Sequence, residues 1–174
     1  GQKSRCERDR WLEGEFMATT YLAARIFDGA EKTIEDGFIT VDGDKITALG
    51  KKLDLGSAAE SAVDLGDATI LPGLINMHTH MTFSADNDVL GNALRDSHEI
   101  KVARAIENLR KAIRSGVTTV RDCGAPNEIA FALRTASANG LIEAPHIWAA
   151  GQVLTSTGGH CYYIGVEVDS IEDI

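Results

Sequence analysis

Short apolar runs separated by turn-forming residues dominate the first part of the chain. Runs of this kind fill residues 21–27, 38–41, 45–49 and 68–71. The second and third runs flank Asp42-Gly43-Asp44, a sequence typical of a β-hairpin turn. Pro72-Gly73 stops the last run, because proline cannot donate to a β-ladder. The pattern predicts a small antiparallel β module over residues 17–72.

Beyond Gly73 the pattern changes to strands that alternate with helices. Strands are predicted at 74–80, 117–120 and 145–150. The first intervening helix has apolar positions at helical spacing, namely Val102, Ile106, Leu109 and Ile113. Its expected start is a capping box of Asp96 and Glu99, and Gly116 follows its end. A second helix is predicted over 126–139, and the β-α-β-α-β order indicates an α/β fold with a parallel sheet, open or closed into a barrel.

Composition narrows the classes of function. The 174 residues carry a formal charge of -9, and an acidic surface disfavours nucleic-acid partners. No apolar run approaches the roughly 18 residues of a membrane span. A complete eight-fold barrel usually needs about 250 residues, so the chain is too short to contain one.

Cysteine use and the first residues bear on location and processing. Cys6, Cys123 and Cys161 are odd in number and widely spaced, which favours reduced thiols and a cytoplasmic protein. Residues 1–16 are highly charged and lack the apolar core of a secretory signal. We interpret them as a tag or an upstream extension that is disordered, with Met17 as a natural start.

The strand after Gly73 contains the motif His78-Thr79-His80. Because alternate strand residues share a face, we expect one face to carry Leu74, Asn76, His78 and His80. The two imidazoles would then project together from the C-terminal end of a parallel strand, where α/β folds place their sites. Such a pair can bind one divalent ion, and zinc suits it, although manganese, iron and nickel also fit. For an isolated motif the alternative is a metal-free pair of hydrogen-bonded histidines.

The residues around this motif resemble a known family. The string ILPGLINMHTH over 70–80 closely resembles the entry into the first barrel strand of the amidohydrolase superfamily. The hairpin over 38–49 is similar to the small β-sandwich that precedes that barrel, and GVTTVRD over 116–122 resembles its second strand. Residues 150–160 are similar to the imidazolonepropionase-like branch, which includes metal-dependent prolidases and carboxypeptidases.

The resemblance implies both a fold and a chemistry. The expected fold is a β-sandwich portion over 17–72, followed over 73–174 by about three βα units of a TIM barrel. The expected cofactor is a divalent metal, zinc above others, with one or two ions in the complete enzyme and His78 and His80 as ligands. The family's lysine, later histidines and aspartate have no match here. No catalytic base can therefore be named, and we predict an N-terminal fragment that is inactive alone.

A loop near the end of the chain supplies the predicted substrate-binding residues. His160 follows Gly158-Gly159, whose flexible backbone could bring the imidazole over the barrel mouth. In the resembled branch this loop contributes to the substrate pocket, so His160 and Tyr162 are candidates. A solvent-exposed loop histidine is the alternative for His160, and a loop anchor is the alternative for Tyr162.

The remaining chemically capable side chains are interpreted as structural. Asp122 ends a strand beside Arg121 and could orient a ligand or hold a loop, and a structural ion pair with Arg121 is the simpler interpretation. The others in this group are His98, His146, Cys123 and Cys161. The cysteines are expected to fill space.

Together these features favour a metal-dependent amidohydrolase that cleaves a C–N bond of a peptide-like substrate, as a dipeptidase or carboxypeptidase does. A cyclic-amide hydrolase such as an imidazolonepropionase is the enzymatic alternative. A non-catalytic half-barrel used for binding or assembly is the alternative of another class. The expected partner is a small peptide-like or cyclic amide substrate, without nucleic acid or membrane, and a homo-oligomer is allowed.

Overall fold

The computed structural model describes residues 18–173, which form two compact units divided between Pro72 and Gly73. The extension predicted over 1–16 lies outside the described residues. Within the described part of the chain, no helix is both long and apolar enough to cross a membrane.

The first unit is a mostly antiparallel β-sheet. Its strands are β1 (Thr19–Phe27), β2 (Thr33–Asp42), β3 (Lys45–Lys51), β4 (Val63–Asp64) and β5 (Thr69–Ile70). The order is β3-β2-β1-β4, and β5 also pairs with β1. Strands β1, β2 and β3 pair antiparallel, whereas β4 and β5 run parallel to β1. A 3-10 segment, Lys52–Ser61, connects β3 to β4.

The predicted hairpin joins β2 to β3. Asp42 pairs with Lys45, and Gly43 between them has a φ of 59°, a conformation that glycine adopts without strain. One face of the sheet buries the apolar side chains of Leu22, Ile26 and Phe38, and Ala23, the neighbour of Leu22 in β1, is buried as well. Alternation along β1 and β2 thus provides the apolar face that this unit needs.

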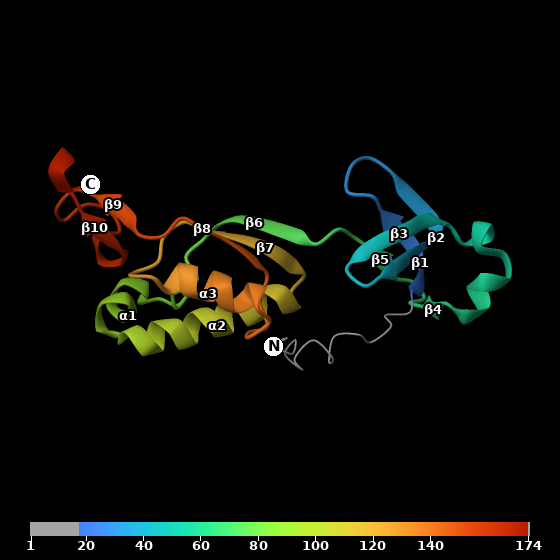
Figure 1. The fold of residues 1–174 in the computed structure, drawn as a ribbon, viewed down its shortest axis with the longest axis horizontal. Coiled ribbons are helices and arrows are strands. Elements are labelled where there is room, and N and C mark those ends of the chain that lie inside the picture. Colours follow the sequence, from blue (N-terminus) through green and yellow to red (C-terminus); the bar gives the residue numbers. More distant parts are fainter. Residues whose placement is uncertain (1–17, 174) are drawn as a thin grey trace, which may run out of the picture. The chain divides into compact units, whose positions relative to one another are not determined.

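The second unit begins with an α/β arrangement. Its first elements are β6 (Leu74–Thr79), α1 (Val89–Arg95), α2 (His98–Arg114), β7 (Val117–Asp122), α3 (Ile129–Ala138) and β8 (His146–Ala149). Strands β6, β7 and β8 form a parallel sheet in that order, and the helices lie along one side of it (Figure 1). A separate parallel pair, β9 (Val153–Thr155) and β10 (Gly165–Glu167), follows, with 3-10 turns at Tyr162–Ile164 and Ile171–Asp173. The predicted α/β class is confirmed.

The core of this unit lies between the helices and one face of the sheet. Helix α2 contributes Leu109 and α3 contributes Ile129, while Val120 and Ile147 come from the strands. Each of these side chains is about 2% exposed. The helical spacing read from the sequence therefore places the apolar stripe of α2 against β7.

The start of α2 differs from the expected capping box. Ser97 is the N-cap, and its hydroxyl accepts a hydrogen bond from the backbone N–H of Ile100. Asp96 is instead the C-cap of α1, and its carboxylate forms an ion pair with Arg104, a residue of α2. At the other end Gly116 has a φ of 89° and follows the C-cap as predicted.

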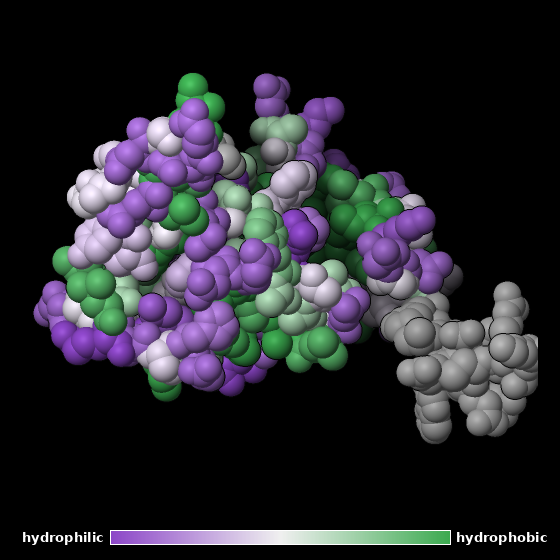
Figure 2. Space-filling view, turned by 60° about the vertical axis from the view of Figure 1, so that its left-hand side comes forward, coloured by the Kyte–Doolittle hydropathy of each residue, from purple (hydrophilic) through white to green (hydrophobic). Residues whose placement is uncertain are grey.

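Strand β6 lies at one edge of the three-stranded sheet, and within the described residues it pairs with β7 alone. Its apolar side chains stay largely open to solvent: Leu74 is 55%, Ile75 62% and Met77 56% exposed. Figure 2 shows hydrophobic side chains reaching the surface among hydrophilic ones. The strand that carries the histidine motif is thus the least covered strand of the parallel sheet.

Candidate functional site

The strand that carries the histidines is irregular just before them. The register between β6 and β7 shifts between Asn76 and Thr79. There the Asn76 side-chain oxygen accepts a hydrogen bond from the backbone N–H of His78 (3.1 Å), and Arg121 Nε donates to the Met77 carbonyl (2.8 Å). The hydrogen-bond ladder between β6 and β7 is therefore irregular just before the histidines, because side chains take over backbone bonds that a regular ladder would use.

His80 is held in one orientation. Its Nδ1 lies 3.0 Å from the Gly124 carbonyl oxygen, which can only accept, so Nδ1 carries the proton. Its ring stacks on Phe83 with centroids 4.8 Å apart. In the neutral form of the ring, this arrangement leaves Nε2 with a free lone pair. A backbone carbonyl that accepts from the other ring nitrogen and so fixes the tautomer is typical of histidines that bind metal.

His78 and His80 form the histidine pair of the site. Their ring centroids are 5.4 Å apart, at an interplanar angle of 65°. With Zn–N bonds of about 2.0 to 2.1 Å, two rings on one ion have centroids no more than roughly 6.5 Å apart. The pair fits two ligands of a divalent ion. Within residues 18–173, however, no group of three or more His, Cys, Asp and Glu side chains is placed to hold a metal.

Asp122, at the end of β7, is the most buried acidic group near the pair. It is fully buried, and its carboxylate accepts hydrogen bonds from the backbone N–H groups of Met81 (2.9 Å) and Gly124 (3.0 Å). Burial raises the pKa of this carboxyl, while the two hydrogen bonds and nearby His80 act in the opposite direction. The expected ion pair with Arg121 is wrong, because that guanidinium bonds to the Met77 carbonyl instead.

Asn108 of α2 is a site-forming residue that the sequence analysis missed. Its side-chain amide donates to the backbone carbonyls of Met81 (2.9 Å) and Phe83 (2.8 Å). It therefore shapes the loop that continues from His80. A polar side chain at the edge of the apolar stripe of α2, one turn from Ala105 and Ala112, was the available signal.

The second unit also contains a small cavity of about 180 Å³ beside His80. Phe83 and Asn108 line it together with apolar side chains from α2 and the strands, including Leu109 and Val120. The cavity lies next to the ring of His80 and is mostly apolar.

Part of the predicted substrate loop lies near Phe83, the ring that stacks on His80. Tyr163, rather than Tyr162, faces Phe83, with ring centroids 6.1 Å apart. Tyr162 packs edge-on against Tyr163 at 5.5 Å and is 41% exposed. His160 is exposed, and no ring contact joins it to the histidine pair among the described contacts.

The glycine-containing part of this loop is tied down. Thr157 donates both its backbone N–H (3.0 Å) and its hydroxyl (2.6 Å) to the Asp169 carboxylate. The backbone N–H of Gly158 donates to Glu167 (2.5 Å). These bonds restrain the backbone that was expected to be free to move His160.

The other candidate side chains lie apart from the pair. His98 contacts the Asn127 amide at 3.4 Å, and His146 packs edge-on against Trp148 with ring centroids 6.0 Å apart. Cys161 is buried, whereas Cys123 is partly exposed near the Met77 carbonyl. None of them joins a metal-binding group within the described residues.

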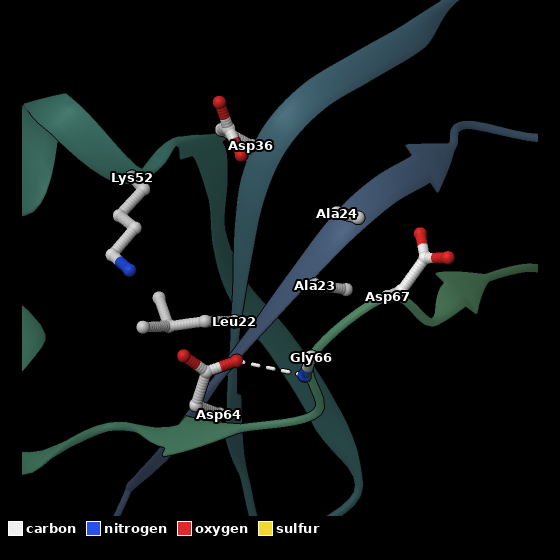
Figure 3. Close-up of a pocket in the computed structure, with 8 residues that line it drawn as sticks. All are labelled: Leu22, Ala23, Ala24, Asp36, Lys52, Asp64, Gly66 and Asp67. Atoms are coloured by element: carbon white, nitrogen blue, oxygen red, sulfur yellow. Dashed lines mark hydrogen bonds between the residues drawn. The ribbon is translucent and has the colours of Figure 1, made fainter.

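The first unit has a cavity of its own, of about 290 Å³ (Figure 3). Its rim includes Asp36, Lys52, Asp64 and Asp67, and the three carboxylates point in different directions. Asp64 accepts from the backbone N–H of Gly66 (2.8 Å), and Asp67 pairs with Arg25 (2.8 Å). At least two of these carboxylates therefore support turns and strands rather than converge on a ligand.

Comparison with known proteins places this geometry in a family context. The model of the amidohydrolase family matches residues 69–173. An imidazolonepropionase of Roseobacter denitrificans is 40% identical over 55 residues, covering 30% of this chain and 14% of that protein. A 5-methylthioadenosine/S-adenosylhomocysteine deaminase of Bacillus cereus is 28% identical over 123 residues, covering 61% of this chain. The chain thus spans only 14% to 28% of the length of these relatives.

Solved structures resemble a larger share of the chain. A Xaa-Pro dipeptidase with bound methionine in its active site is 28% identical with a TM-score of 0.72, covering 91% of this chain and 38% of its own. A prolidase complexed with N-methylphosphonate-L-proline is 26% identical with a TM-score of 0.73, covering 90% of this chain and 41% of its own.

Proposed function

Because the chain belongs to the amidohydrolase family, we propose that it supplies the first metal-binding strand of a divalent-metal-dependent hydrolase. The observation that carries the proposal is the fixed orientation of His80 beside His78 at the end of β6. When bound, the metal would lower the pKa of a water molecule and polarise the scissile carbonyl. The chain's own part is to hold the Nε2 lone pair of His80 ready. Zinc is the proposed ion, with one or two in the complete enzyme.

The proposed setting of this strand is a TIM barrel. Residues 73–174 would be about its first three βα units, with β6, β7 and β8 as successive strands, and residues 17–72 would belong to a β-sandwich portion. In such a barrel the metal ligands lie at the C-terminal ends of the strands, where His78 and His80 are found. Cytoplasmic location stays a prediction.

The proposed substrate is peptide-like, cleaved at a C–N bond as a dipeptidase or carboxypeptidase cleaves it. Support comes from the Xaa-Pro dipeptidase, whose structure matches 91% of the chain. A cyclic amide is the second candidate, because an imidazolonepropionase is 40% identical to the chain over 55 residues. His160 and Tyr162 remain proposed substrate contacts, and Tyr163 joins them because it faces Phe83. No macromolecular partner is proposed beyond a homo-oligomer.

The coding sequence gives the first test. An open reading frame beyond codon 174 with a lysine, two histidines and an aspartate at later strand ends would support the enzyme. A stop codon at that point would instead favour a non-catalytic half-barrel for binding or assembly.

The second test measures metal and activity together in the longest natural form of the protein. His78→Asn and His80→Asn are expected to lower bound zinc and hydrolysis of dipeptides, N-acyl amino acids or cyclic amides. His98→Asn is the matched control, because His98 contacts Asn127 and lies apart from the pair. Unchanged metal content in His80→Asn would contradict the proposal.

A further inference from the structure

The buried carboxylate of Asp122 connects the two chain segments that enclose His80. One oxygen, Oδ2, accepts the backbone N–H of Met81 (2.9 Å), the residue directly after His80. The other, Oδ1, accepts the backbone N–H of Gly124 (3.0 Å). The two carboxylate oxygens of Asp122 thus join the segment that follows β6 to the segment that follows β7.

Gly124 carries this constraint to the imidazole. Its N–H is bound by Asp122, and its carbonyl accepts the Nδ1 proton of His80 (3.0 Å). Only glycine fits there, since φ is 156° and an added Cβ would lie 2.4 Å from Val153 Cγ2. The Gly124 N–H is therefore held by the carboxylate, and Val153 leaves no room for a side chain at this position.

We propose that Asp122 is a positioning residue, which sets the Nδ1–H tautomer of His80 through the Gly124 backbone. The inference rests on the proposed function, because it matters only if the Nε2 lone pair binds metal. A group that selects the tautomer of a ligating histidine without itself binding the metal raises metal affinity. Asp122 makes no hydrogen bond to the His80 ring and acts on it through the Gly124 backbone. It therefore differs from a carboxylate that accepts directly from the ring of a ligating histidine.

A purely structural role is the competing explanation. Asp122 bonds two backbone groups in the core, so its removal also weakens the fold. Stability measurements alone cannot separate the two roles. The tautomer of His80 can, because a loss of stability elsewhere in the unit leaves that hydrogen bond in place.

The test is NMR of the whole 174-residue chain labelled with ¹⁵N-histidine, without metal. The signals of His80 are assigned by their disappearance in His80→Gln. We expect the wild-type ring as the Nδ1–H tautomer, and in Asp122→Asn a tautomer ratio lower by about fivefold, as for the loss of one neutral hydrogen bond. Leu133→Ala is the control: it removes a core side chain that is 4% exposed and should leave the tautomer unchanged.

A second variant reaches the same link without touching the carboxylate. In Gly124→Ala the added Cβ would displace the Gly124 carbonyl, so we expect the His80 tautomer ratio to fall as in Asp122→Asn. This variant keeps the test decisive if Asp122→Asn does not fold. A wild-type Nε2–H tautomer overturns the proposal. So does an unchanged tautomer in a folded Asp122→Asn or in Gly124→Ala, or an equal change in Leu133→Ala. Because no metal is present, the metal analysis described above can fail or succeed independently.

Discussion

Replacing Asn108 by alanine removes the two hydrogen bonds that tie α2 to the loop after β6. The amide nitrogen donates to the carbonyls of Met81 (2.9 Å) and Phe83 (2.8 Å), both with ordinary geometry. A neutral hydrogen bond in a folded protein contributes about 1 kcal/mol net. The free energy of unfolding of the unit that follows Pro72 should therefore fall by about 2 kcal/mol in Asn108→Ala.

Urea unfolding followed by circular dichroism at the helical band measures this loss. All α-helices of the described residues lie in the second unit, so the helical signal reports on that unit. With a urea slope of about 2 kcal/mol/M, the midpoint of Asn108→Ala should fall by roughly 1 M.

Asn139→Ala provides the control for this measurement. Asn139 is exposed at the end of α3, and only its backbone N–H takes part in the described hydrogen bonds. Its replacement should change the free energy of unfolding by less than about 0.5 kcal/mol. If Asn108→Ala were as mild as this control, the two bonds would not hold the loop and the reasoning would be refuted.

Two further predictions concern the second unit. Leu109→Ala should lower its free energy of unfolding by about 2 to 5 kcal/mol, because the side chain is buried in the core; Leu141→Ala, at an exposed position, should have little effect in the same urea experiment. The hydrogen bond from Arg114 lowers the pKa of Glu143, so this pair stabilises the folded state above the ordinary carboxyl pKa, and the stabilisation is lost as the pH falls through the lowered folded-state value. Glu143→Gln should therefore lower the urea midpoint at neutral pH and leave it unchanged near pH 2. An equal effect at both pH values would contradict the ion pair.

Local patterns predicted the elements of the fold, because each depends on neighbouring residues. The hairpin at Gly43 and the end of α2 at Gly116 follow from positive φ angles that glycine tolerates. The start of α2 was misplaced because Asp96, a good capping residue by type, is occupied by Arg104 eight positions away. Its neighbour Ser97 caps the helix instead.

The candidate site could be predicted only in part, for the same reason. His78 and His80 stand in one short motif, so the sequence alone points to them. Gly124, which orients His80, is 44 positions away, and Asn108 bonds to Met81 across 27 positions. Gly124 reaches His80 because β6 and β7 pair in parallel, and Asn108 reaches Met81 because α2 packs on the sheet. No local pattern contains either contact.

Within the described residues, the only strand that pairs with β6 is β7, which is synthesised later. Thr79 of this strand bonds to Arg121 of β7, 42 residues later in the chain. At a synthesis rate of about 5 to 20 residues per second, β6 waits about 2 to 8 s on the ribosome before its partner strand exists. During that interval the backbone groups of β6, and the two histidines at its end, have no strand to pair with, so the histidine pair cannot take its final orientation before β7 and Gly124 have been made.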